Sequence, residues 1–286
     1  MTGFEIRDMT PADVDAAVAL ALAQGWRDRR RFYEFVLRTS TCLPLVGVVE
    51  GRVVATGVGT TSRPIGWIGA IVVEEGLRRR GLGRAMTETI CDGLRAAGCV
   101  TLSLEATNAG QPLYEHMGFR FVTCYHQLQA DRLPEPPVPP AGARVRTVGP
   151  ADLEAIFELD RLATGEDRSV PVGLLAEAGG WVLEDAALEP GAAASLRGFL
   201  LPAERMYGAI VAPCFEDGLF LLDWHRYIIP EGAHVRAGIP HEHERAWTEL
   251  LARGWQETWR APRLLLGPDV AWQPEWIWGQ INSAMG

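Results

Sequence analysis

The chain has 286 residues, of which 48% are hydrophobic and 22% charged, and its formal net charge is −9. This length exceeds one ordinary hydrophobic core, so we expect two domains. The acidic balance argues against nucleic acid as a main partner, because phosphate binding needs a basic face. No apolar run reaches the roughly 18 residues of a membrane span, and the N-terminus MTGFEIRDMT has no signal-peptide pattern. We therefore expect a cytoplasmic protein without a membrane partner.

Hydrophobic periodicity, helix caps and turn residues predict a mixed α/β unit in the first half of the chain. In chain order we expect a strand at 4–7, a helix capped by residues 10–13, a helix at about 28–38, strands near 45–50, 53–60 and 67–73, a loop at 74–82, a helix at 83–97, a strand at 100–106, a helix at 110–117 and two closing strands at 119–122 and 124–129.

The second half of the chain repeats the first at a nearly constant offset. The repeated anchors are IRDMTPADVDAA from Ile6 with VRTVGPADLEAI from Val145, GAIV at 69–72 with GAIV at 208–211, and LYEHMGF ending at Phe119 with LLARGW ending at Trp255. The period is far longer than that of a solenoid, so we interpret it as a duplicated domain whose second copy follows the same element order.

A proline-rich segment separates the two copies. Residues 134–140 read PEPPVPP, which cannot lie in a helix or a central strand. We therefore expect a first domain at 1–133, a linker at 134–140 and a second domain at 141–286.

The strongest chemical signal is IVVEEGLRRRGLGRAM, from Ile71 to Met86, where an apolar strand runs through a polar turn into an amphipathic helix. The turn contains R-x-x-G-x-G, and its glycines allow a ligand to approach backbone N–H groups at a helix N-terminus, which favours an anion such as a pyrophosphate. A Rossmann dinucleotide site would explain an acidic residue at Glu105, but Met86 stands at the third glycine position. A plain capping turn would explain Gly81 but not the whole motif.

These residues resemble the GNAT superfamily of acetyl-CoA-dependent N-acetyltransferases. The R-x-x-G-x-G turn matches its pyrophosphate loop, and ATNAGQPLYEHMGF at 106–119 matches its second signature. The resemblance implies two tandem domains, each with a central mixed, mostly antiparallel sheet flanked by helices. It also implies acetyl-CoA as cosubstrate, a small-molecule amine as acceptor and no metal.

The resemblance assigns roles to particular positions. The backbone of the turn would hold the pyrophosphate, Val72 and Val73 at the end of the fourth strand would contact the pantetheine arm beside a β-bulge, and Asn108 would contact the cofactor from the fifth-strand side. Tyr114 would contact the cofactor and protonate the leaving thiolate, although a tyrosine packing on a helix face is the simpler alternative. The residues of the turn are Arg78, Arg79, Arg80, Gly81, Leu82, Gly83 and Arg84.

The general base is the least defined catalytic group. The expected fourth strand, GWIGAIVV, has no carboxylate, and Trp67 stands about where relatives that acetylate protein lysines place one. Glu105, at the end of the fifth strand, is the nearest candidate, with a solvent-facing strand end as the alternative. A water chain or an acceptor of low pKa would also serve.

Trp26, Tyr33 and Tyr125 are candidates to line the acceptor pocket, although each could equally belong to the core. The five cysteines form no C-x-x-C pair and are interpreted as reduced, mostly buried thiols. We interpret His126 as a structural histidine. The His-Glu-His run at 241–243 lacks the i, i+4 spacing of a helical zinc site, so we expect it at the surface without a metal.

The second copy has lost the chemical signals of the first. At an offset of 139, Arg78–Gly83 corresponds to Asp217–Leu222, which reads DGLFLL. At the offset of 136 that relates Phe119 to Trp255, Tyr114 corresponds to Leu250. We expect a degenerate domain whose altered turn is buried. Eight tryptophans lie in this half, forming a core, a domain or homodimer surface, or part of an acceptor pocket. Two functions remain open: an amine acetyltransferase and a non-catalytic acyl-CoA sensor.

Overall fold

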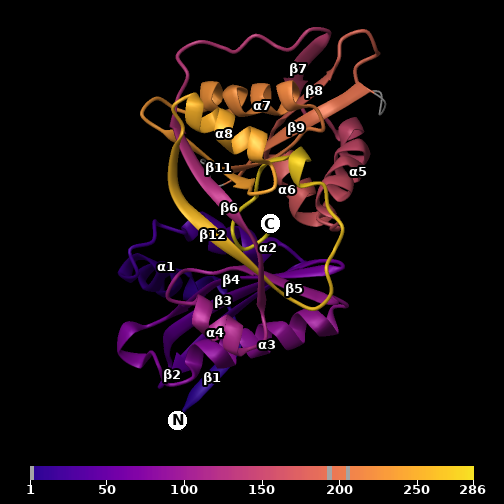
Figure 1. Cartoon of the computed structure of the whole chain (residues 1–286). Helices are drawn as coiled ribbons and strands as arrows, with labels where there is room; N and C mark the ends of the chain where they lie inside the picture. Colours follow the sequence, from indigo (N-terminus) through magenta and orange to yellow (C-terminus); the bar gives the residue numbers. More distant parts are fainter. Residues whose placement is uncertain (1–2, 192–194, 204–206) are drawn as a thin grey trace. The chain divides into compact units, whose positions relative to one another are not determined.

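The computed structural model describes residues 3–191, 195–203 and 207–286. By its internal contacts the chain forms two compact units (Figure 1). The first unit comprises residues 1–120, 264–269 and Met285, and the second comprises 121–263, 270–284 and Gly286. Contacts therefore assign residues 121–133, which the sequence suggested as the end of the first domain, to the second unit.

The first unit contains the predicted elements in the predicted order. They are β1 (Phe4–Asp8), η1 (Pro11–Asp13), α1 (Val14–Ala23), α2 (Arg30–Arg38), β2 (Cys42–Val49), β3 (Arg52–Ser62), β4 (Ile65–Val73), η2 (Glu75–Leu77), α3 (Leu82–Ala96), β5 (Thr101–Glu105) and α4 (Gln111–His116). The strands are paired in the order β1-β2-β3-β4-β5. All neighbours are antiparallel except β4 and β5, which are parallel.

Helices cover both faces of this sheet, as the alternation of side chains along β3 shows. Thr56 lies within hydrogen-bond reach of Tyr33 on α2. The next residue, Gly57, faces α3 so closely that a Cβ atom there would lie 2.7 Å from the Cδ1 of Ile90. Because successive strand residues point to opposite faces, α2 and α3 lie on opposite sides of the sheet. Gly59 allows the same close approach.

Both halves begin with the same helix-capping arrangement. Arg7 donates two hydrogen bonds to the carboxylate of Asp13, which also accepts from the backbone N–H of Thr10. In the second half, Arg146 donates two hydrogen bonds to Asp152. The same ion pair at the same offset supports the duplication that the sequence predicted.

From β7 onward the second unit repeats the order of α-helices and strands seen from β1 to β6, and it adds a short C-terminal strand. Its elements are β6 (Arg120–Asp131), β7 (Ala143–Thr147), η3 (Pro150–Asp152), α5 (Leu153–Thr164), α6 (Ser169–Ala178), β8 (Trp181–Asp185), β9 (Leu196–Ala203), β10 (Tyr207–Val211), α7 (Phe215–Ile228), β11 (His234–Pro240), α8 (Glu244–Ala252), β12 (Gln256–Leu266), η5 (Pro274–Trp276) and β13 (Ile277–Gly279).

The strands of the second unit pair differently from those of the first. One sheet has the order β13-β10-β9-β8-β7, whereas β11 pairs antiparallel with β6. The neighbour of β10 is thus β13, while its counterpart β4 has β5. The two closing strands expected at 119–122 and 124–129 form the single strand β6, since no turn residue interrupts them.

The segment at 134–140 contains neither helix nor strand, as its prolines predict. Among the described residues, no helix combines the length and the apolar character needed to cross a bilayer.

Candidate active site

Strands β4 and β5 separate beyond the middle of β4. Their parallel pairing extends only from Ile65 with Thr101 to Ile68 with Leu104, although β4 continues to Val73. The register between β3 and β4 shifts at this point, and Ala70 has a φ of 53°. A bulged residue in the left-handed region bends a strand and re-aims its backbone groups. The bulge expected from the sequence is therefore present, and it opens the edge of β4 toward Val72 and Val73.

The turn that follows β4 is shaped for an anion. Arg79 and Gly81 both have left-handed backbones, with φ of 59° and 85°, and Gly81 is the N-cap of α3. Amides in the first turn of a helix have no intrahelical acceptor, and the first to gain one here is Ala85, which donates to the carbonyl of Gly81. These amides and the positive end of the helix dipole can bind phosphate oxygens.

The arginines of the turn are exposed, so their charges face solvent around this helix end. Arg78 donates to the backbone carbonyl of Val73 over 3.2 Å, which ties the turn to the end of β4. Arg84 is paired with Glu88, one helical turn further on. Gly83 lies within the helix, where an added Cβ would meet only ordinary contacts at 3.6 Å or more. Gly81, with its positive φ, is thus the glycine that the backbone requires.

Tyr114 lies on α4 and is 8% exposed. Its ring packs edge-on against Phe119, with the centroids 6.0 Å apart, inside the cluster that includes Met86 and Leu104. Burial raises the pKa of Tyr114 to about 12, so the phenol keeps its proton at neutral pH. Both interpretations of the residue from sequence thus remain possible: the ring packs in the core, and the hydroxyl can act as an acid.

Three further predicted residues lie on or after β4 and β5. Glu105 is the last residue of β5 and is half-buried, and Asn108 is exposed in the turn before α4. Trp67 is fully buried on β4, opposite Ser103 of β5. Strand β4 has no carboxylate, and Glu105 is the single acidic residue of β5.

The three aromatic residues suggested for the acceptor pocket are mostly buried. Tyr33 is fully buried, and its hydroxyl lies 3.4 Å from that of Thr56, which in turn donates to the carbonyl of Ala70 in the bulge. Tyr33 therefore braces the bulge from α2 rather than presenting an open ring, a link that sequence reasoning missed. Trp26 is half-buried under Arg29, and Tyr125 is buried.

The region of the second unit that corresponds to the turn is a helix, which corrects the sequence prediction of an altered turn. The connection from β10 to α7 is shortened to residues 212–214, so Asp217–Leu222 lies inside α7. Asp217 is buried and ion-paired with Arg197. Residues 217–222 are buried, as the sequence predicted. They are buried because the loop is missing and these residues lie inside α7.

The C-terminal strand fills the edge of β10. Ala212, the counterpart of Val73, donates its N–H to the carbonyl of Trp276 and accepts a hydrogen bond from the indole of Trp278. Trp278 is fully buried, and a Cβ on Gly218 would lie 2.0 Å from its ring. The backbone edge that is open on β4 is therefore occupied by the chain itself on β10.

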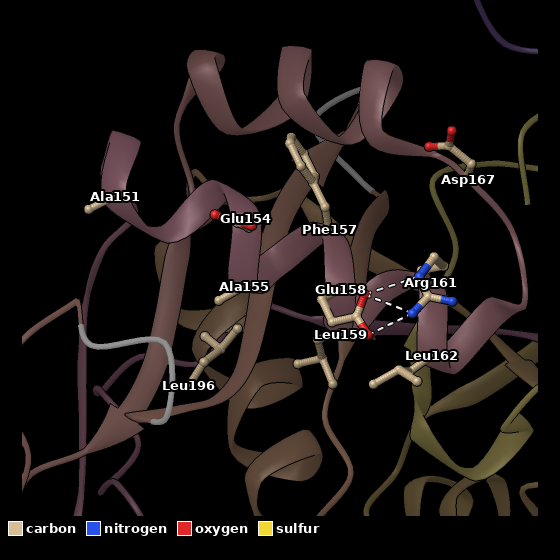
Figure 2. A pocket seen from close by; sticks show the side chains of 10 residues that line it. All are labelled: Ala151, Glu154, Ala155, Phe157, Glu158, Leu159, Arg161, Leu162, Asp167 and Leu196. Carbon is tan, nitrogen blue, oxygen red and sulfur yellow. Dashed lines mark hydrogen bonds and ion pairs between the residues drawn. The ribbon is translucent and has the colours of Figure 1, made fainter.

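A hollow of about 620 Å³ lies along α5 in the second unit. Figure 2 shows the side chains that line it. Apolar side chains such as Phe157 and Leu162 line it together with four charged residues, Glu154, Glu158, Arg161 and Asp167. Of these, Glu158 and Arg161 are paired with each other. None of the residues predicted from the sequence lines this hollow, and it lacks the converging polar groups of a catalytic site.

Residues 13–119 match the profile of the acetyltransferase (GNAT) family. A glucosamine 6-phosphate N-acetyltransferase of Trypanosoma brucei brucei is 36% identical over 58 residues, which are 20% of this chain and 40% of that protein. The chain thus spans less than half the length of this curated relative.

Two solved structures resemble nearly the whole chain. A structure from Pyrococcus horikoshii has a TM-score of 0.82 at 20% identity, with 100% of this chain and 97% of that chain covered. A tandem GNAT protein from the clavulanic acid biosynthesis pathway has a TM-score of 0.65 at 18% identity, with 93% and 99% covered. At these identities the likeness establishes the fold alone.

The fold and the profile together define a protein of two GNAT-like domains in tandem. The match to the acetyltransferase (GNAT) family covers residues 13–119, which lie within the first unit.

Proposed function

We propose that this protein transfers the acetyl group of acetyl-CoA directly to an amine of a small-molecule acceptor. The observation that carries the proposal is the separation of β4 from β5 beside the N-terminus of α3 in one unit. An elongated ligand with a pyrophosphate at one end fits such a slot. The amides at the start of α3 would hold the phosphates, and the open edge of β4 at Val72 and Val73 would bond the pantetheine arm.

The chemistry needs a neutral amine, donors for the oxyanion and a proton for the leaving thiolate. Tyr114 supplies the proton in this proposal, because its position in LYEHMGF matches the family's proton donor and its phenol is protonated at neutral pH. Burial, which raises the pKa of Tyr114 to about 12, makes it a weaker acid than an exposed tyrosine. Deprotonating an alkylamine of pKa near 10 at pH 7 costs roughly 4 kcal/mol. Glu105 is the proposed base, acting alone or through water, since β4 has no carboxylate.

The test is release of free thiol from acetyl-CoA by the full chain across a panel of small amines, with the acetylated product identified by mass spectrometry. We expect thiol release that depends on one class of amine. Binding of coenzyme A without turnover on any amine of the panel would overturn the proposed acetyltransferase activity and favour a non-catalytic acyl-CoA sensor. The observation that supports the sensor is the missing carboxylate on β4. Absence of coenzyme A binding would overturn both the acetyltransferase and the acyl-CoA sensor.

We also propose that residues 141–286 form a domain without a cofactor site. The shortened connection at 212–214 and the bonds of Ala212 to Trp276 and Trp278 support this. Calorimetry on the full chain should therefore find one coenzyme A per chain. Two sites per chain would contradict the proposal.

A further inference from the structure

Three potential metal ligands meet in the second unit, two on β6 and one directly after β11. Cys124 and His126 are two residues apart on β6, so their side chains leave the same face of the strand. The antiparallel register places Ile239 opposite His126 and Pro240 opposite Tyr125. The next residue, His241, therefore stands across from Cys124, and its backbone N–H donates to the Cys124 carbonyl over 2.9 Å.

The ligand atoms are close enough to share one ion. The Sγ of Cys124 and a ring nitrogen of each histidine all lie within 4.8 Å of one another. His126 Nε2 and His241 Nδ1 are 3.1 Å apart. Zinc bonds of about 2.3 Å to sulfur and about 2.0–2.1 Å to nitrogen place tetrahedral ligand atoms about 3.3–3.6 Å apart. The two nitrogens are thus near that spacing, and the thiol needs an adjustment of about an ångström.

Surrounding residues orient both rings. Glu257 contacts His126 Nδ1 at 2.5 Å, so that nitrogen carries the proton and the lone pair of Nε2 points toward His241. Trp247 stacks on His126 with the ring centroids 4.3 Å apart, and its indole N–H donates to the carbonyl of His241. A carboxylate behind a metal-binding histidine is the usual outer arrangement in zinc sites.

The cluster also has an entry path. His126 is fully buried, Cys124 is half-buried and His241 is exposed, so an ion can arrive from the solvent side of His241. A hydrogen bond between the two imidazoles would account for the histidine pair, but it would give no reason for the thiol beside them.

We propose that Cys124, His126 and His241 bind one Zn²⁺ ion, with the fourth position left to water. A thiolate and two neutral imidazoles form a ligand set that suits zinc and disfavours magnesium or calcium, which prefer oxygen. Binding releases the Cys124 thiol proton to solvent, so the bound ion with its protein ligands carries one net positive charge. The Glu257 carboxylate next to the site is shared with Arg260, so the charges of these two side chains balance each other.

The experiment uses the full chain, stripped of metal with a chelator and titrated with Co²⁺ as a spectroscopic probe. We expect one Co²⁺ per chain, a thiolate-to-cobalt charge-transfer band in the near ultraviolet and displacement by one equivalent of Zn²⁺. Cys124→Ser should abolish the band, and Glu257→Gln should lower the Zn²⁺ affinity about 10- to 100-fold. Loss of a direct ligand in His241→Ala should lower it further.

Matched controls come from the same unit. Cys214→Ser removes an exposed thiol and His234→Ala a partly exposed imidazole, neither of which belongs to the cluster. Both variants should keep the band and the affinity. His241→Ala changes an exposed side chain, so it carries the test even if Cys124→Ser fails to fold. Absence of Co²⁺ and Zn²⁺ binding by the wild-type chain, or binding that survives His241→Ala unchanged, would overturn the proposal.

Discussion

Replacing Gly81 with alanine tests the anion-binding turn at the residue where the backbone requires glycine. Gly81 has a φ of +85°, and a Cβ there would meet nothing within 4 Å. The substitution therefore adds backbone strain without a steric clash. A left-handed conformation costs an L-residue roughly 1–2 kcal/mol relative to glycine. If the turn relaxes to relieve that strain, the amides at the start of α3 lose their arrangement around the phosphates.

Since 1.4 kcal/mol is a factor of ten, the expected loss of coenzyme A affinity in Gly81→Ala is about 5- to 30-fold. Isothermal calorimetry on the full chain measures it directly. Gly76→Ala is the matched control, because Gly76 lies in the same loop, has open space around its Cβ position and has no positive φ. This control removes the same backbone freedom from the unfolded chain and should bind coenzyme A as the wild type does.

The reasoning fails if Gly81→Ala and Gly76→Ala bind coenzyme A equally well. Circular dichroism and thermal unfolding of both variants would show whether the fold is intact, so that a loss of binding is not mistaken for a loss of structure.

Three further predictions concern other parts of the chain. Tyr114→Phe should keep coenzyme A affinity and lower kcat by about 10² to 10⁴, and a kcat near the wild-type value with chemistry rate-limiting would remove the acid role. Gly218→Ala should lower the free energy of unfolding by about 1–3 kcal/mol in a denaturant titration, because the added methyl overlaps Trp278. The control is Gly173→Ala in α6, where the added methyl makes an ordinary 3.4 Å contact, so this variant should be neutral or stabilising. Burial lowers the pKa of His225 from 6.5 to about 4, so the unfolded chain takes up this proton first as the pH falls. The wild type should therefore lose stability between about pH 6.5 and 4. Thermal melts of His225→Gln should show a smaller loss across that range. Melting temperatures of the two proteins that fall in parallel with pH would contradict this.

Local features of the first half could be predicted from sequence because they depend on neighbouring residues. The sequence predicted a glycine-containing turn at a helix start, and Gly81 is the N-cap of α3 with a φ of 85°. The PAD motifs predicted repeated caps, and both form the same 3₁₀ turn with an arginine–aspartate pair. The bulge at the end of β4 followed from the family resemblance and is present at Ala70.

Other features depend on residues far apart in the chain. An offset alignment assumed that the connection after β10 keeps the length of the one after β4, and its shortening turned Asp217–Leu222 into helix. Tyr33 looked free to line a pocket because nothing nearby in sequence reveals that Thr56 and the bulge lie beneath its hydroxyl.

The sequence by itself determined the order of the elements, the duplication and the glycine turn at the start of α3, because helix periodicity, capping and backbone φ are set within a few residues. Tertiary structure alone decided which strand borders β10 and which side chains meet around His126. Strand pairing joins segments more than a hundred residues apart, as His126 and His241 are, and each pairing is chosen by the packing of the whole sheet rather than by any local preference.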